Sequence, residues 1–288
     1  MVNRDEKRKS DVRDLPAVQE SNQKWWTQHT MSYDWNEKLG IEKFTDAWFD
    51  EVDRRFVHGA RLFAHDHTPF DRVIPFKELN GKRVLEIGCG MGYHSELLVR
   101  AGAKLTSVDI SETSVNATRR RFELRALSAD IMRMDAAQLD FPDGSFDFVW
   151  SWGVIHHSAY TAKIIREMSR VLRDRGQVRL MVYNLNGMSA YVAMMFSYLL
   201  GVWRGKSLDE CLWSKTDGYM ARYYSDDVLS DFMSVFFSEV QAQTFGQDVD
   251  AVPLPRRLRN FVMSFMSDRR IAELANRRGG FLFMTAIK

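Results

Sequence analysis

Short apolar runs alternate with segments of helical periodicity along most of this chain. The apolar runs lie at 83–87, 104–108, 131–134, 146–150, 177–183, 239–244 and 281–287. Between the fourth and fifth runs, Ile164, Ile165 and Met168 recur at helical spacing, and Gly176 follows them. Continuous apolar runs are typical of buried parallel strands, and helical spacing is typical of helices packed on a sheet. The pattern predicts an α/β fold with a mostly parallel sheet and helices on both faces.

The N-terminal part of the chain has a different composition. Residues 1–21 are polar and without periodicity, so we expect a disordered tail. Four large aromatic residues fall within 25–35, and helical spacing of apolar residues marks 41–63. The aromatic cluster either packs on the domain or closes over a ligand as a lid. The expected division is a tail at 1–21, a helical or lid segment at 22–80, and a main domain at 81–288 with helical insertions at 184–224 and 250–280.

A glycine-rich turn, VLEIGCGMG at 84–92, follows the first run of the main domain. Its G-x-G-x-G spacing differs from the G-x-G-x-x-G of dinucleotide-binding folds, and it lets the backbone approach a ligand closely. Glu86 stands two residues before the first glycine. A carboxylate there repels a pyrophosphate and attracts an ammonium or sulfonium group. Both features favour S-adenosylmethionine as the ligand, and a nicotinamide dehydrogenase is the alternative.

Three segments resemble motifs of the class I S-adenosylmethionine-dependent methyltransferases. They are VLEIGCGMG at 84–92, MDAAQLDFPDGSFD at 134–147 and SWGVIHHS at 151–158. The resemblance is specific from Gly81 to Tyr183, roughly a third of the chain. It implies a Rossmann-like sheet of seven strands whose last strand is antiparallel, with helical lid insertions. It also implies an enzyme that uses S-adenosylmethionine and releases S-adenosylhomocysteine.

One carboxylate is placed to bind the ribose of this cofactor. Asp109 ends the second predicted strand, 17 residues after Gly92, where it can accept hydrogen bonds from both ribose hydroxyls. The resemblance implies that Glu86 and the glycine loop hold the methionine end, and that Asp135 and Ala136 contact the adenine. Alternatively, Asp135 caps the turn that follows it. The expected cofactor-binding residues are Glu86, Gly88, Cys89, Gly90, Gly92, Asp109, Ile110, Asp135, Ala136, Ser151 and Trp152.

Two adjacent histidines, His156 and His157, follow the fourth predicted strand, near the place where the methyl donor must point. Histidine has an unperturbed pKa of about 6.5, which suits proton removal near neutral pH. Adjacent histidines cannot both face one site, so we expect His157 rather than His156 to act as a base. A structural role for both is the alternative. Tyr33 and Tyr183 are the next candidates, and an acidic acceptor would need no base.

The acceptor class is inferred from motifs that the sequence lacks. Amino-methylating nucleic-acid enzymes of this family carry Asp or Asn, Pro-Pro and an aromatic residue after the fourth strand, where this chain has SWGV at 151–154. The Pro-Cys of cytosine C5 enzymes is also absent. An oxygen or nitrogen of a small molecule, such as a sugar or secondary metabolite, is therefore the expected acceptor. The alternatives are RNA or another macromolecule as acceptor, or a non-catalytic adenosine-binding module.

Composition narrows these expectations further. A formal charge of +2 with 45% hydrophobic residues does not indicate a nucleic-acid binder. The two cysteines and the histidines within 65–67 indicate neither a disulfide framework nor a metal site. No apolar run reaches the roughly 18 to 20 residues of a membrane span, so we expect a cytoplasmic protein. Nothing in the sequence indicates the oligomeric state.

Three more segments have competing interpretations. The apolar stretch 188–203 is expected to form a buried helix, with a pocket lid or a membrane-interface helix as alternatives. The run Arg119-Arg120-Arg121 is expected on a solvated helix face. The arginines of 256–278 are also expected to be solvated, with an anionic substrate or a nucleic acid as the alternative.

Overall fold

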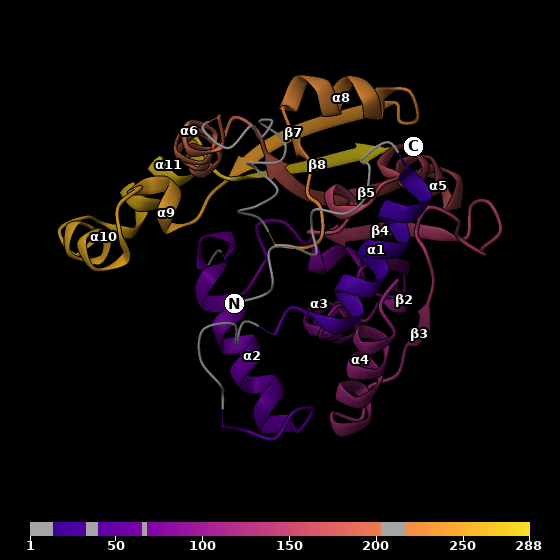
Figure 1. The fold of residues 1–288 in the computed structure, drawn as a ribbon. Helices are drawn as coiled ribbons and strands as arrows, with labels where there is room; N and C mark the ends of the chain where they lie inside the picture. Colours follow the sequence, from indigo (N-terminus) through magenta and orange to yellow (C-terminus); the bar gives the residue numbers. More distant parts are fainter. Residues whose placement is uncertain (1–13, 33–39, 65–67, 203–216) are drawn as a thin grey trace.

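The computed structural model describes residues 14–32, 40–64, 68–202 and 217–288, and they form an α/β fold around one sheet (Figure 1). The strands follow the order β3-β2-β1-β4-β5-β8-β7, and β6 pairs with β5 off this path. Their bounds are β1 Arg83–Ile87, β2 Lys104–Asp109, β3 Asp130–Arg133, β4 Phe146–Trp152, β5 Leu172–Asn184, β6 Tyr223–Tyr224, β7 Glu239–Phe245 and β8 Phe281–Ile287. Only β8 runs antiparallel to its neighbours β5 and β7. The predicted fold class is therefore confirmed.

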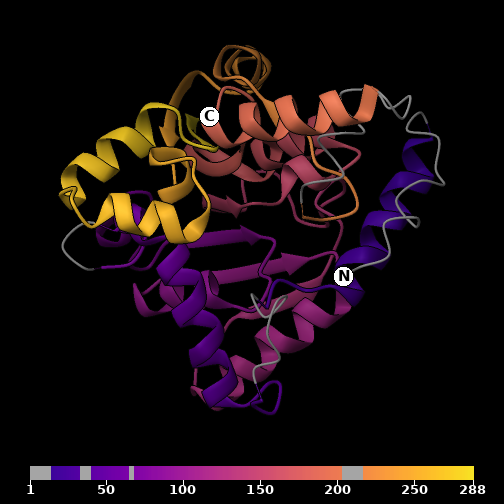
Figure 2. The ribbon, with the colours of Figure 1, turned by 60° about the vertical axis from the view of Figure 1, so that its left-hand side comes forward.

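The helices of the described residues cover both faces of the sheet (Figures 1 and 2). They are α1 Leu15–Gln28, α2 Asp46–Gly59, α3 Tyr93–Arg100, α4 Glu112–Leu124, α5 Thr161–Val171, α6 Met188–Val202, α8 Asp226–Ser234, α9 Asp248–Ala251, α10 Arg256–Met263 and α11 Asp268–Arg277. Short 3-10 turns add η2 Arg61–Phe63, η3 Phe76–Glu78 and η4 Ile155–His157. No helix among these residues is long and apolar enough to cross a membrane.

The two-residue period of β1 explains why both faces need helices. Leu85 and Ile87 point into a core shared with α5 and α8, whereas Val84 points into a second core shared with α3 and α4. Successive side chains of a strand point to opposite faces, so a strand with apolar side chains on both faces must be covered twice. The order of strands reverses between β1 and β4, and the carboxyl ends of strands at such a switch point open a ligand crevice.

The predicted tail at 1–21 is wrong for its last residues, because α1 begins at Leu15. The side chain of Asp14 caps the helix by accepting a hydrogen bond from the backbone N–H of Ala17 at 3.2 Å. Only Val18 and Asn22 of α1 are buried. A helix that buries one apolar side chain has almost no hydrophobic periodicity, so the sequence pattern missed it.

The predicted solvated face at 119–121 is wrong for Arg121. Its side chain is fully buried and donates to Asp53 of α2 at 2.8 Å and to Glu96 of α3 at 2.7 Å. A buried arginine requires such partners. Arg121 of α4 thereby connects α2 to α3 through two ion pairs.

The predicted buried helix at 188–203 is also wrong, because much of α6 is exposed. Tyr191, Phe196 and Leu200 are 49%, 60% and 63% accessible. The other expected insertion, 250–280, contains α9, α10 and α11, and the arginines of α10 are largely exposed as expected.

Candidate active site

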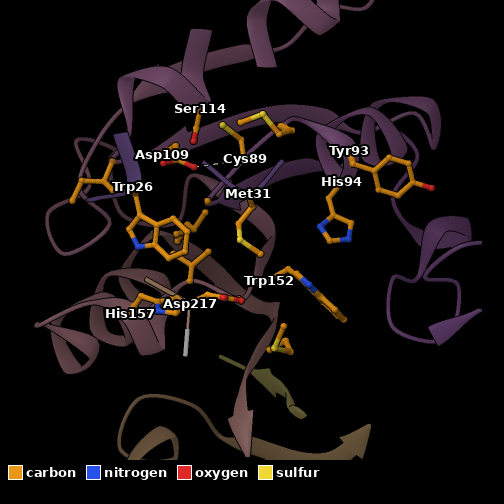
Figure 3. A pocket seen from close by; sticks show the side chains of 18 of the residues that line it. Trp26, Met31, Cys89, Tyr93, His94, Asp109, Ser114, Trp152, His157 and Asp217 are labelled. Atoms are coloured by element: carbon orange, nitrogen blue, oxygen red, sulfur yellow. Dashed lines mark hydrogen bonds between the residues drawn. The ribbon is translucent and has the colours of Figure 1, made fainter. Parts of the chain in front are cut away.

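A cavity of about 570 Å³ opens at the carboxyl ends of β1, β2, β3 and β4. The loops after these strands form one wall, and α1 and α2 form the opposite wall. Figure 3 shows Asp109 and Cys89 on the strand-end wall, Trp26 and His157 at one end of the cavity, and Tyr93 and His94 at the other. A volume of this size is typical of small-molecule sites.

The glycine loop lies close against the loop after β4. Gly88 has φ +86°, and a Cβ there would stand 2.1 Å from Cγ2 of Val154. Only glycine avoids both the left-handed strain and this clash. The backbone N–H of Gly90 donates to Oδ2 of Asp109 at 3.0 Å, which holds the loop against the end of β2.

Asp109 is a partly buried carboxylate whose two oxygens face different donors. Oδ2 accepts from Gly90, and Oδ1 accepts from the backbone N–H of Ser111 at 2.8 Å. Burial raises the pKa of Asp109, and the backbone N–H groups oppose this increase. Each carboxylate oxygen has further acceptor capacity for a ligand in the cavity.

Asp135 lies at the cavity after β3 and meets two protein donors. Its Oδ1 accepts from the backbone N–H of Ala137 at 2.9 Å, so it does cap the following turn. Its Oδ2 accepts from Nε2 of Gln19 on α1 at 3.0 Å. Gln19 also accepts from the backbone N–H of Ala159 at 3.0 Å and thus bridges the loops after β3 and β4.

The structure brings most of the predicted cofactor residues to one cavity. Those that line it are Gly88, Cys89, Gly90, Asp109, Ile110, Asp135, Ala136 and Trp152. Gly92 and Ser151 do not line it. Glu86 also lies behind the loop, where the hydroxyls of Ser95 and Ser107 donate to its carboxylate. Burial raises the pKa of Glu86 to about 7.

The two predicted histidines have different environments. His157 lines the cavity, and its Nδ1 lies 2.7 Å from the carbonyl oxygen of Met220. A carbonyl only accepts, so Nδ1 carries the hydrogen, and the lone pair of the neutral ring is on Nε2. His156 does not line the cavity, and burial lowers its pKa well below the usual value. Tyr183 lines the cavity, and Tyr33 lies outside the described residues.

Sequence reasoning missed the polar side chains of α1 that face the cavity. Asn22 lines it and is 3% exposed, yet neither its amide nitrogen nor its amide oxygen has a partner among the described residues. Native structures rarely leave buried polar atoms unpaired, and a bound ligand or water is the usual explanation. The N-cap residue Asp14 and the proline two residues later were the sequence signals for this helix.

The end of the cavity between α2 and β8 is aromatic. Its lining includes Phe56, Phe63, Tyr93, His94, Trp152 and Phe281. The ring of Trp152 lies edge-on to Phe63 at 4.9 Å and to His94 at 5.5 Å. Burial and the nearby charge of Arg121 lower the pKa of His94 to about 3, so its ring is neutral at physiological pH. Nε2 of His94 is buried without a partner in the described part of the chain.

Comparison with known proteins identifies the family. Residues 85–180, which hold the glycine loop, Asp109, Asp135 and both histidines, match the family model described as "Methyltransferase domain". The chain therefore contains a methyltransferase domain, which occupies residues 85–180. S-adenosylmethionine is therefore its cofactor.

Proteins similar to this chain include methyltransferases whose names mention small molecules. The chain is 27% identical over 151 residues to the ubiquinone biosynthesis O-methyltransferase of Nitrosococcus oceani, covering 51% of this chain and 61% of that protein. It is 36% identical over 107 residues to the 27-O-demethylrifamycin SV methyltransferase of Amycolatopsis mediterranei, covering 35% of this chain and 38% of that protein. The matches thus span between about two fifths and three fifths of these relatives.

Solved structures share the methyltransferase fold at low sequence identity. A phosphoethanolamine N-methyltransferase of Haemonchus contortus in complex with S-adenosylhomocysteine has a TM-score of 0.54 at 17% identity, covering 86% of this chain and 60% of that one. The cyclase SpnF has a TM-score of 0.52 at 17% identity, covering 96% and 93%. A cyclase on this fold means that the fold alone does not establish methyl transfer.

Proposed function

We propose that this protein transfers the methyl group of S-adenosylmethionine to a hydroxyl oxygen of a small-molecule acceptor. One observation carries the proposal: the same cavity is lined by the carboxylates Asp109 and Asp135, by His157 and by the aromatic residues of its far end. The names of the relatives, which include O-methyltransferases, support the choice of oxygen. An amine acceptor is the alternative within the same site.

The described residues fit an adenosine-containing ligand. The carboxylate oxygens of Asp109 lie beside the glycine loop and can accept hydrogen bonds from ribose hydroxyls. The side-chain amide of Asn22 provides a donor and an acceptor that have no partner among the described residues. Asp135 and the backbone of Ala136 provide an acceptor and a donor for an adenine edge, with Gln19 of α1 alongside. The glycines of the loop expose backbone that the methionine part can approach closely. We assign cofactor binding to these residues.

The reaction requires alignment of two reactants and removal of one proton. When bound, S-adenosylmethionine supplies an electrophilic methyl group on a sulfonium sulfur. The acceptor oxygen forms the new O–CH3 bond while the S–CH3 bond breaks, and the hydroxyl proton goes to a base. The hydrogen bond from Nδ1–H to the carbonyl of Met220 supports His157 as this base, because it leaves the basic lone pair on Nε2.

The aromatic end of the cavity is suited to the acceptor. Trp152, Phe63 and Phe281 offer ring faces and edges, and neutral His94 offers one unpaired nitrogen. Such a lining favours an uncharged ring that carries a hydroxyl, since a buried anion would find no positive partner at His94. Rings pack on rings at low cost, and Nε2 of His94 can pair with a polar substituent of the ring other than the hydroxyl that reacts near His157.

Calorimetry with S-adenosylmethionine, S-adenosylhomocysteine and NAD tests the ligand, and a labelled-methyl assay on fractionated extract tests transfer. We expect both sulfur ligands to bind and NAD not to bind. Asp109→Ala should weaken binding at least about tenfold, because hydrogen bonds to a charged acceptor contribute about 1.5 to 3 kcal/mol each. Asp130→Ala, at the exposed start of β3, is the matched control. Unchanged affinity in a folded Asp109→Ala variant would remove Asp109 from the site.

A further inference from the structure

The helix α10 exposes an apolar stripe that the active site does not use. Leu258 and Phe261 are three residues apart and lie on one side of α10, and Leu254 and Phe265 flank the helix in the sequence. Phe261 and Phe265 are 63% and 76% exposed, and their rings contact each other at 5.2 Å. None of the residues of α10 is buried. Side chains of this kind at such exposure indicate an interaction surface.

Arginines are frequent on α10 and on the next helix, α11. Residues 254–278 contain seven arginines and two acidic residues, Asp268 and Glu273. The arginines are Arg256, Arg257, Arg259, Arg269, Arg270, Arg277 and Arg278. Within the described part of the chain, Arg256 and Arg257 make no ion pair, whereas Arg269 pairs with Glu273. The helix therefore combines an apolar side with uncompensated positive charge.

Helix α6, which begins beside the end of α11, has a second exposed apolar surface. Its first residue is tied to α11, because the backbone N–H of Met188 donates to the carbonyl of Arg278 at 2.7 Å. Figures 1 and 2 both show the start of α6 beside α11. The sequence of α6, MSAYVAMMFSYLLGV, contains no charged residue, and Met195, Phe196 and Leu199 are more than half exposed.

We propose that α6 and α10 form a surface that binds lipid bilayers containing anionic phospholipid. Both helices lie in the bilayer interface, with the apolar side chains among the acyl chains and the arginines against the lipid phosphates. α6 has 15 residues, too few to span a bilayer, so it lies on the membrane rather than across it. The seven arginines favour an anionic bilayer over a second copy of the chain, because a symmetric dimer through α10 would bring like charges together.

Vesicle flotation with the full chain tests this surface without cofactor or acceptor. We expect binding to vesicles of phosphatidylglycerol and phosphatidylcholine, weaker binding to phosphatidylcholine alone, and weakening by salt. The double variants Phe261→Ser/Phe265→Ser and Leu199→Ser/Leu200→Ser should each lower the partition coefficient about tenfold or more. Arg256→Glu/Arg257→Glu should abolish the preference for the anionic vesicles. Circular dichroism checks that each variant is folded.

The matched control is Val228→Ser/Val235→Ser, which removes two equally exposed apolar side chains at α8 and should leave binding unchanged. Absence of binding to anionic vesicles by the wild type would overturn the proposal. Equal loss in the control variant would do the same. Light scattering tests whether a second copy of the chain binds this surface instead of a bilayer. A wild-type dimer that the variant Phe261→Ser/Phe265→Ser dissociates would show this. Cofactor binding in these variants is measured in parallel, so failure here leaves the proposed methyl transfer intact.

Discussion

The two walls of the cavity differ in how their polar atoms are satisfied. On the strand-end wall, both oxygens of Asp109 already accept backbone hydrogen bonds, and Nδ1 of His157 donates to a backbone carbonyl. On the helical wall and at the aromatic end, the amide of Asn22 and Nε2 of His94 are buried without partners among the described residues. The named groups of the first wall have protein partners, whereas Asn22 and Nε2 of His94 have none among the described residues.

This contrast distinguishes polar groups that the fold already positions from polar groups that a ligand would have to pair. A buried polar group without a partner destabilises the fold by about 1 to 3 kcal/mol, and a ligand that pairs with it recovers that free energy on binding. Groups already held by the backbone are instead positioned in advance, as catalysis requires. We therefore expect substitution of His157 to affect turnover most, and substitution of Asn22 to raise stability while it lowers affinity.

The largest expected effect is that of His157→Ala. Loss of the base should lower kcat about 100-fold or more and remove the acidic limb of the pH–rate profile, while affinity for S-adenosylhomocysteine changes little. Single-turnover kinetics and calorimetry measure the two quantities. His58→Ala, at an exposed position of α2, is the control. Turnover within a fewfold of wild type would mean that another group removes the proton, with Tyr183 first in line.

The sequence predicts the strand-end wall well because its signals are local. The first apolar run was expected at 83–87, and β1 has these bounds. A buried strand followed by three alternating glycines can be recognised within ten residues of sequence. The end of β2 at Asp109 and the loop after β3 follow from the same alternation. The role of each residue at the cofactor stays a prediction that the experiments above address.

The helical wall could not be predicted because tertiary packing creates it. α1 has a polar sequence, and the partners of Gln19 lie 116 and 140 residues away in the chain. The aromatic end combines Phe63, Trp152 and Phe281 from three distant segments. Arg121 was misjudged for the same reason, because its partners belong to α2 and α3. Single-segment periodicity contains no information on such pairings.

Asn22→Leu tests the contrast directly, with an intermediate expected effect. Leucine has a similar volume and removes two unpaired polar atoms, so the ligand-free protein should become more stable while affinity for S-adenosylhomocysteine falls about tenfold. Thermal unfolding without ligand and calorimetry measure the two opposite changes. Asn116→Leu, on the exposed side of α4, should alter neither. Loss of stability together with unchanged affinity would show that Asn22 supports the fold and not the ligand.

The last expected effect concerns Glu86, which lies behind the strand-end wall. Burial raises its pKa from 4.5 to about 7 in the folded protein, so the folded state keeps a proton that the unfolded state releases above pH 4.5. The unfolded state binds fewer protons in this range, and the free energy of unfolding therefore falls as pH rises from about 4.5 to about 7. The change is at most on the order of 3 kcal/mol. Glu86→Gln cannot ionise, and its amide still accepts hydrogen bonds from Ser95 and Ser107.

Urea unfolding at pH 5 and pH 8 measures this contribution. Wild type should lose more stability than Glu86→Gln between the two pH values. Asp109, whose pKa burial also raises, titrates in both proteins, so the difference between the two slopes isolates Glu86. Equal slopes would show that Glu86 is ionised in the folded protein throughout this range. A permanent negative charge behind the glycine loop would then attract the cationic end of the cofactor, and Glu86→Gln should weaken binding of S-adenosylmethionine more than binding of S-adenosylhomocysteine, which lacks the sulfonium charge.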